Sequence, residues 1–421
     1  MTTAEKPAVI DVLDPTLFVR GVAHDVFDWI RENDPVHRDD KNGLWVISKY
    51  DDVAYVERRP ELFCSALGIR PTGGHSANLS IVSMDDPEHA RQRKIVSRGF
   101  TPSRINALVD HVRDLARELV DAVAAKGECD FVEDIAKPLP LIVIAETLGL
   151  PPEDRVQLAQ WSDTMMSAES AQGDDDPRLA AAGVAWGEYV TYLVGLIEDR
   201  RAHPRDDLIS VLLSATESGE LGHDRDTLHS DVAAAGGPTD ALVDDELLMF
   251  LVLLLVAGNE TTRNALSGGM EAFSRFPQER EKLVADLSLV NSATEEIVRY
   301  VSPVISFSRT VTADTELRGK ELKQGDVVLN VYPSANRDAD MFDDPHAFRV
   351  DRSPNLHLAF GTGPHFCLGA NLARTEIRIM LEEVFGRLPD MRLAPGAEVE
   401  RAPNALVTTI EHLPVVFTPE R

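Results

Sequence analysis

A glycine-rich loop around a single cysteine, FGTGPHFCLGA at residues 360–370, carries the most distinctive chemistry in the sequence. Three glycines surround Cys367, and a proline stiffens the middle of the loop. Glycine at this density permits unusual backbone angles and lets a flat ligand approach the main chain. A helix predicted over 368–388 would begin directly at the cysteine, so its positive end would face the sulfur and lower the pKa of the thiol.

A lone cysteine is more often a buried apolar side chain than a ligand. Here the glycine pattern, the nearby His365 and the helix start favour a ligand instead. Zinc and iron–sulfur sites need three or four ligands, and the other cysteines, Cys64 and Cys129, lie far away in the sequence. The pattern therefore favours one thiolate bound to a haem iron.

A second candidate site is the run AGNETT at 257–262, in the middle of a long apolar helix. Gly258 costs about 1 kcal/mol there relative to alanine. Glu260 and Thr261 place a carboxylate and a hydroxyl next to each other. One interpretation is a solvated patch or a local kink. The other is a proton-delivery point, where Gly258 lets a ligand approach, Thr261 donates a hydrogen bond and Glu260 connects to water.

Two charged pairs have weaker signals. Glu296 and Arg299 stand at i and i+3, and such a pair on a helix surface is common and contributes only a few tenths of a kcal/mol. His89 and Arg93 stand at i and i+4, so they share a helical face that would suit two anionic groups. An exposed basic turn explains His89 and Arg93 equally well.

The elements that would position these residues are mainly α-helical, with small β-sheets. A hairpin is expected over 36–47, with Asn42-Gly43 at its turn, and a strand pair over 316–332. A last strand is expected over 413–417. The central helix should begin at Asp244 and Asp245 and end before Pro277. Helical spacing dominates a core over 80–300 and the C-terminal part, at 103–126, 138–149, 181–201, 245–276, 278–300 and 369–386.

The composition narrows the possible classes. The net charge of −28 over 421 residues argues against nucleic-acid binding. The longest apolar run, 247–257, falls short of the roughly 20 residues of a membrane span. Residues 1–15 lack the pattern of a secretory signal, and the odd number of cysteines suggests a reducing, cytoplasmic environment. No linker divides the chain, so one domain over 1–421 is expected, with two tightly packed domains as the alternative.

Three motifs in order resemble the cytochrome P450 superfamily of haem-thiolate monooxygenases. They are Phe-Gly-x-Gly-x-His-x-Cys-x-Gly at 360–369, Ala/Gly-Gly-x-acid-Thr at 257–261, and Glu-x-x-Arg at 296–299. The resemblance covers essentially the whole chain. It implies the triangular, mainly helical prism of that family, with haem between the central helix and the helix that follows the cysteine.

The resemblance also implies a role for each matching residue. Cys367 would be the proximal ligand of the iron of haem b, and Glu260 and Thr261 would deliver protons to the co-substrate dioxygen. Glu296, Arg299 and Arg352 would form a buried structural triad. The haem propionates would be bound by His89, Arg93, Arg309 and His365. Further contacts to the haem would come from Ala257, Gly258, Phe360, Gly361 and Gly369.

The family layout predicts an apolar substrate pocket built from segments that include 79–84 and 165–166. Its lining would be Val82, Met84, Met165, Leu253, Ala257, Val304, Ile305, Phe307, Leu406 and Val407. Such apolar residues can equally be ordinary core. The segments 68–71, 259–270, 334–336, 355–360 and 414–418 look like the actinobacterial enzymes that hydroxylate sterol side chains or methyl-branched lipids. A steroid such as cholesterol, oxidised at a terminal methyl of its side chain, is the expected substrate, with a methyl-branched lipid beside it.

Electrons would have to come from other proteins, since no flavin or nicotinamide motif is visible. The resemblance implies a ferredoxin and an NAD(P)H-dependent ferredoxin reductase. The basic segment 88–104 would attract the ferredoxin, unless it is simply a solvated helix face. The alternatives that stay open are hydroxylation of a terpene, macrolide or fatty acid, a peroxygenase driven by hydrogen peroxide, and a non-catalytic haem sensor.

Overall fold

The computed structural model describes residues 10–70, 80–171, 173, 175–217 and 241–421. Residues 71 and 79, which belong to segments singled out above, lie outside this range, and so does the start of the chain up to residue 9. The side chain of Asp244 is also outside the description.

The chain forms two compact units, each assembled from segments that are distant in the sequence. The first, here named the cysteine unit, comprises Met1–His75, Ile105–Pro140 and Glu260–Arg421. The second, the helical unit, comprises Ser76–Arg104 and Leu141–Asn259. The central helix α9 (Ala241–Arg275) contributes residues to both. The division therefore falls within helices and not at a linker.

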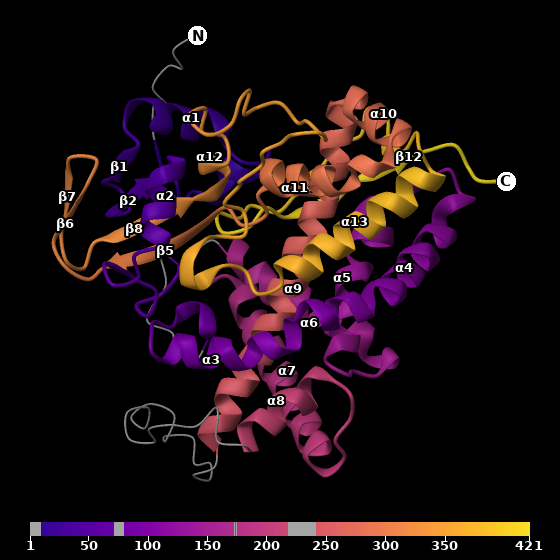
Figure 1. Cartoon of the computed structure of the whole chain (residues 1–421), viewed down its shortest axis with the longest axis horizontal. Coiled ribbons are helices and arrows are strands. Elements are labelled where there is room, and N and C mark those ends of the chain that lie inside the picture. Colours follow the sequence, from indigo (N-terminus) through magenta and orange to yellow (C-terminus); the bar gives the residue numbers. More distant parts are fainter. Residues whose placement is uncertain (1–9, 71–79, 172, 174, 218–240) are drawn as a thin grey trace. The chain divides into compact units, whose positions relative to one another are not determined.

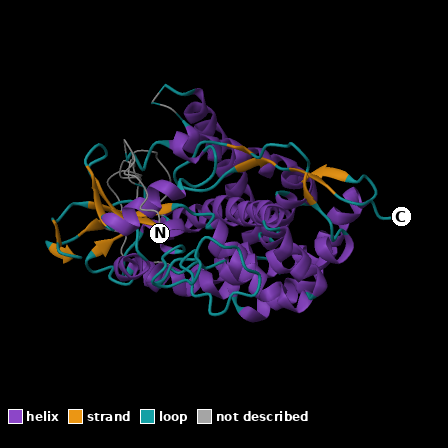
Figure 2. Cartoon of the chain, turned by 90° about the horizontal axis from the view of Figure 1, so that it is seen from above, coloured by secondary structure: helices purple, strands orange, loops and turns teal. Residues whose placement is uncertain are grey.

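A five-stranded sheet forms one part of the cysteine unit (Figures 1 and 2). Its order is β1 (Val36–Asp39), β2 (Leu44–Ile47), β8 (Val327–Val331), β5 (Ser306–Val311) and β3 (Phe63–Cys64). β1 and β2 form the predicted hairpin, and Gly43 has a φ of 68° at its turn. Alternate side chains of β8 pack into two core clusters, Val328 into one and Leu329 into the other.

Helices cover this sheet and extend the cysteine unit. Figure 1 shows α1 (His24–Asn33), α2 (Tyr50–Glu57) and α12 (Tyr332–Ala335) beside the sheet. A second group of helices packs around α13 (Ala370–Arg387), namely α4 (Pro102–Ala124), α10 (Pro277–Ala285) and α11 (Val290–Val301). Small sheets complete the unit, formed by β4 (Glu128–Asp130), β12 (Pro414–Val416) and β9 (Arg392–Leu393), and by β10 (Glu400–Arg401) and β11 (Ile410–His412).

Several predicted boundaries are wrong. The segment 278–300 is two helices, because the side chain of Asp286 accepts the N–H of Ser288 at 3.0 Å and caps a 3-10 turn between them. The predicted pair at 316–332 is a short hairpin of β6 (Thr315–Leu317) and β7 (Lys320–Leu322), while β8 joins the large sheet. Helix α9 begins at Ala241, earlier than Asp244 and Asp245 suggested.

The helical unit contains α3 (Glu88–Val96), α6 (Arg155–Ser167), α7 (Pro177–Ala202) and α8 (Leu208–Glu217), with most of α5 (Pro138–Thr147). Trp161 of α6 packs on Tyr189 of α7, with ring centroids 5.5 Å apart. Helix α7 alone among the described helices has the length and composition of a possible membrane span, with 22% of its most apolar window buried. A single helix of this kind is weak support for a membrane span.

Candidate active site

The cysteine loop lies in the cysteine unit, directly before α13. Cys367 is a thiol and is half-buried. Its N–H donates to the carbonyl of Phe360 at 2.8 Å, which closes the loop on itself. The helix begins at Ala370 and not at the cysteine as predicted, because Gly363–His365 forms a 3-10 turn and Gly369 is the cap of α13. Cys367 therefore stands three residues ahead of the helix start.

The three glycines of the loop differ in backbone conformation and in the space around their Cβ positions. Gly361 and Gly363 have φ values of 67° and 70°, which side chains rarely adopt. A Cβ on Gly363 would lie 2.6 Å from the backbone oxygen of Glu57, and one on Gly361 would lie 3.0 Å from its Oε2. A Cβ on Gly369 would meet nothing within 4 Å. Two glycines thus fit the loop against α2, and the third borders open space beside Cys367.

The predicted triad of Glu296, Arg299 and Arg352 comes together in the interior, so the interpretation of Glu296–Arg299 as a surface pair is wrong. Glu296 and Arg299 are fully buried and form two hydrogen bonds of 2.8 Å. The Nε of Arg352 donates to Oε2 of Glu296 at 3.0 Å. The remaining N–H groups of Arg299 donate to three backbone carbonyls, so all five are used.

A second network, which sequence reasoning missed, flanks the loop. Glu295 accepts two hydrogen bonds from Arg374, at 2.6 and 2.9 Å, and one from His357 Nε2 at 3.2 Å. Burial favours the protonated carboxyl, but these bonds outweigh it and lower the pKa of Glu295 to about 2. The guanidinium of Arg374 lies 4.5 Å from the ring centroid of Phe360. We call Glu295, His357 and Arg374 the Glu295 clamp.

The four residues expected at the propionates are divided between the units. In the cysteine unit, Arg309 is buried and donates to Glu57 at 3.2 Å, and His365 Nε2 lies 3.2 Å from Ser65 Oγ. In the helical unit, His89 and Arg93 lie on α3. His89 is buried, which lowers its pKa, and its Nδ1 lies 3.3 Å from Asp86 Oδ1. A joint site of all four stays a prediction.

Helix α9 is unbroken from Ala241 to Arg275, so the AGNETT segment does not interrupt it. Leu253 and Thr261 are half-buried and Ala257 is exposed, whereas most other residues of α9 between 251 and 270 are buried. These three residues stand at i, i+4 and i+8, and therefore form one uncovered strip along the helix. A Cβ on Gly258 would lie 3.6 Å from Ile144, in ordinary contact.

Glu260 is not part of a solvated patch, because its side chain is 2% exposed. Its Oε2 forms an ion pair with Arg263 Nη2 at 2.7 Å, and Arg263 was not foreseen from the sequence. Thr262 is hydrogen-bonded to Glu376 of α13, a fully buried glutamate whose pKa burial raises to about 8. The uncovered strip of α9 therefore carries the hydroxyl of Thr261, whereas the carboxyl group of Glu260 and the hydroxyl of Thr262 are buried.

The residues expected in the substrate pocket differ in burial. Val82, Met165, Val304, Phe307 and Leu406 are half-buried, as a lining would require, whereas Met84 and Val407 are buried. Ile305 is 1% exposed and belongs to a core cluster with Leu329 and Val331. The members of this set fall in both units, so their meeting in one pocket stays a prediction.

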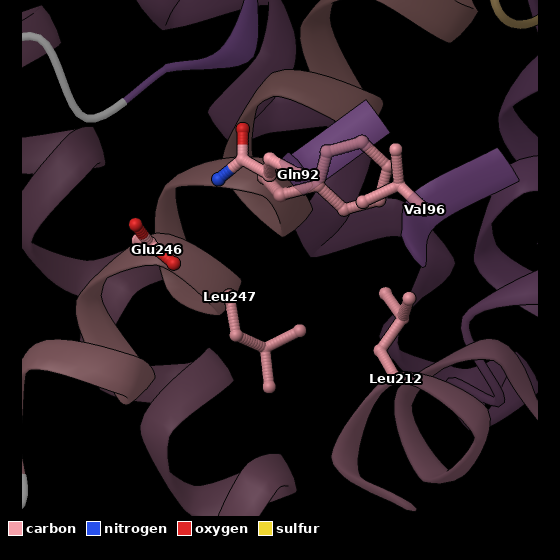
Figure 3. Close-up of a pocket in the computed structure, with 6 residues that line it drawn as sticks. Gln92, Val96, Leu212, Glu246 and Leu247 are labelled. Atoms are coloured by element: carbon pink, nitrogen blue, oxygen red, sulfur yellow. The ribbon is translucent and has the colours of Figure 1, made fainter. Parts of the chain in front are cut away.

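A separate small cavity in the helical unit is too small to hold a substrate (Figure 3). Its volume is about 10 Å³, room for one water molecule. Figure 3 shows side chains of α3, α8 and α9 around it. The lining is Gln92, Val96, Leu212, Glu246, Leu247 and Phe250.

Comparison with known proteins decides the family. The model of the family described as Cytochrome P450 matches residues 177–409. The chain belongs to the cytochrome P450 family. A steroid C26-monooxygenase of Mycolicibacterium smegmatis is 41% identical over 97% of this chain and 96% of its own length. A methyl-branched lipid omega-hydroxylase of Mycobacterium bovis is 38% identical over 90% of this chain and 85% of its own. The structure of CYP109E1 of Bacillus megaterium in complex with testosterone matches with a TM-score of 0.81 and 34% identity, covering 93% and 96% of the two chains.

This P450 is accordingly a monooxygenase that uses a haem iron and dioxygen. The described residues fit such a group. Cys367 provides a half-buried thiol, and the open space at Gly369 leaves room for a flat ligand beside it. Thr261, which belongs to the same unit as Cys367, is half-buried on α9, so its side chain is partly accessible to a ligand. The donor set is that of a haem-thiolate centre.

Proposed function

We propose that this P450 hydroxylates a steroid of the cholesterol type at a terminal methyl of its side chain, with a methyl-branched lipid as the second candidate. The observation that carries the proposal is the agreement of full-length relatives, which are named as steroid C26-monooxygenases and methyl-branched lipid omega-hydroxylases. Both kinds of substrate are extended, apolar and end in a branched methyl. The testosterone complex of CYP109E1 supports a steroid on this fold.

The bound group in this proposal is haem b, which supplies the activation of dioxygen when held by a thiolate. The role of Cys367 is to hold the iron through its sulfur. Thr261 faces the uncovered strip of α9, where its hydroxyl can donate a hydrogen bond to the reacting oxygen. Glu260 would pass protons to Thr261 after leaving its ion pair with Arg263, since a carboxylate held by a guanidinium cannot also relay a proton.

Electrons would come from an acidic ferredoxin, itself reduced by an NAD(P)H-dependent reductase in the cytoplasm. Lys94, Arg98 and Arg104 are exposed on the helical unit and could attract it. Arg91 also belongs to the basic segment 88–104, but it is less suitable because it pairs with Glu246 at 2.6 Å. Arg98→Glu should slow reduction several-fold at low salt without changing substrate affinity. Arg20→Glu, the same charge change at an exposed site of the cysteine unit, is the control. Equal rates for both variants would refute this docking site.

A spectral titration of the ferric protein tests the substrate class. Cholesterol, a methyl-branched fatty acid, a straight-chain fatty acid, a terpene and a macrolide would each be added, and displacement of water from the iron would be followed by the Soret shift. The steroid or the branched acid should bind tightest, and turnover should place the hydroxyl on a terminal methyl. Tightest binding of the terpene or macrolide, or oxidation at a ring carbon, would overturn the proposal. Efficient turnover with dilute peroxide alone would instead support a peroxygenase.

A further inference from the structure

Glu57, at the end of α2, is a buried carboxylate that contacts both the cysteine loop and Arg309. Its side chain is 2% exposed. Oε1 accepts a hydrogen bond from the Tyr332 hydroxyl at 2.7 Å and one from Arg309 Nη2 at 3.2 Å. Oε2 accepts the backbone N–H of Thr362, in the cysteine loop, at 3.0 Å. One carboxyl group therefore joins a sheet strand, a helix and the loop that carries Cys367.

The fit of the loop depends on Glu57 as well. The Cβ positions of Gly361 and Gly363 both point at this residue, at 3.0 Å from its Oε2 and 2.6 Å from its backbone oxygen. The loop glycines thus allow the main chain to lie directly on the end of α2. A displacement of Glu57 would therefore shift the backbone at Gly363, four residues before Cys367.

The two side chains that donate to Glu57 Oε1, those of Tyr332 and Arg309, differ in how much of their donor capacity Glu57 uses. Burial and then the charge of Glu57 raise the pKa of Tyr332 well above its ordinary value, so the hydroxyl stays a donor. Arg309 donates to Glu57 and to the carbonyl of Ser308 at 2.8 Å. A guanidinium has five N–H groups, so these two contacts leave it capacity for a further anion. Glu57 and a cofactor carboxylate would then share one guanidinium.

We propose that Glu57 is a positioning residue that fixes the cysteine loop, holds Arg309 ready for a carboxylate of the haem, and lowers the reduction potential of the iron by its buried negative charge. A fixed anion near a metal centre favours the oxidised state, and burial weakens the screening of that anion. The inference rests on the haem-thiolate assignment and not on the steroid substrate, so each can fail without the other.

The test compares haem-loaded Glu57→Gln with the wild type in a spectroelectrochemical titration without substrate. The glutamine keeps the shape of the side chain and removes its charge. The ferrous-to-ferric ratio at a fixed potential should rise by up to about tenfold, which is about 59 mV for one electron. Asp52→Asn is the matched control, because Asp52 is also a buried carboxylate on α2 but pairs with Arg318, away from the loop. Equal shifts in the two variants, or no shift in Glu57→Gln, would overturn the proposal.

A second variant separates charge from position. Glu57→Asp keeps the charge but withdraws the carboxylate from the N–H of Thr362. Its potential should stay near that of the wild type, while its reduced, carbon monoxide-bound form should lose the thiolate-type absorption severalfold faster. This variant also serves if Glu57→Gln yields no folded haem protein. A potential raised by Glu57→Asp, together with unchanged loss of the thiolate band, would contradict both parts of the inference.

Discussion

Two buried glutamates of the cysteine unit, Glu296 and Glu57, both pair with arginine but do so in different ways. Glu296 accepts from two guanidiniums, and every N–H group of Arg299 is used within the protein. Glu57 has one guanidinium, and Arg309 keeps donor capacity. A closed network, whose arginine has no N–H group left, such as that of Glu296, can only stabilise the fold. An open network, whose arginine keeps unused N–H groups, such as that of Glu57 beside the cysteine loop, can also hold a ligand.

The largest effect is expected where the closed network is broken. Glu296→Gln would leave two buried guanidiniums without their anion, which typically costs about 3–5 kcal/mol of unfolding free energy. Urea unfolding of the haem-loaded protein measures this loss. Asp52→Asn should lose less, because its partner Arg318 is 41% exposed. If Glu296→Gln is not recovered folded, Arg352→Lys tests the same network more mildly. If Glu296→Gln and Arg352→Lys lose no more unfolding free energy than Asp52→Asn, the Glu296 network is not more stabilising than the Asp52–Arg318 pair.

The same contrast explains what could be predicted from the sequence. Glu296 and Arg299 are three residues apart on one helix, so their pairing is local and belongs to a recognisable motif. Glu57 and Arg309 are 252 residues apart, and nothing near either residue indicates the other. The Glu295 clamp is hidden for the same reason, since His357 and Arg374 reach Glu295 from separate segments.

The fold follows a similar rule. The hairpin at 36–47 has its signal in Asn42-Gly43, and the centres of the long helices follow from local periodicity. The helical spacing of its neighbours predicts a helix that runs through Asp286, but the side chain of Asp286 caps a turn instead. The parallel pairing of β2 with β8 joins strands that are far apart in the sequence and could not be derived from periodicity.

A third buried glutamate, Glu376, differs from Glu296 and Glu57, because no arginine or lysine pairs with it among the described residues. Burial raises its pKa from an ordinary 4.5 to about 8, so the folded state keeps it protonated. Its stabilising contribution is complete below about pH 4.5 and is lost as the pH rises toward 8, because only the unfolded chain ionises there. Glu376→Gln cannot ionise. The unfolding free energy of the variant, relative to that of the wild type, should therefore increase by about 2–4 kcal/mol when the pH is raised from 5.5 to 8.5.

Chemical unfolding at both pH values measures the gain of Glu376→Gln. Glu382→Gln, on the same helix, removes a carboxylate that pairs with Arg113 and Arg378, and should show no gain at pH 8.5. A pH-independent difference between Glu376→Gln and the wild type would mean that Glu376 is ionised in the folded protein. It would then resemble Glu296 and Glu57 and need a cation.

The smallest effect is expected at the Glu295 clamp, which tests whether the cysteine loop is held from a second side. Arg374→Gln removes two hydrogen bonds to Glu295 and the contact with Phe360, whose carbonyl accepts the N–H of Cys367. Arg374→Gln should lose about 1–2 kcal/mol of unfolding free energy. The control Arg378→Gln breaks the i,i+4 pair of Arg378 with Glu382 on the same helix, and should lose about 0.5 kcal/mol.

The pH dependence separates the clamp from Glu376. With a pKa of about 2, Glu295 stays charged, so the loss in Arg374→Gln should be the same at pH 5.5 and 8.5 and shrink only as the pH falls below about 4.5. Arg374→Gln should also lose the thiolate-type absorption of its reduced, carbon monoxide-bound form faster than Arg378→Gln does. If both variants lose it at one rate, the loop is held by Glu57 and its own backbone, and the clamp only joins α11 to α13.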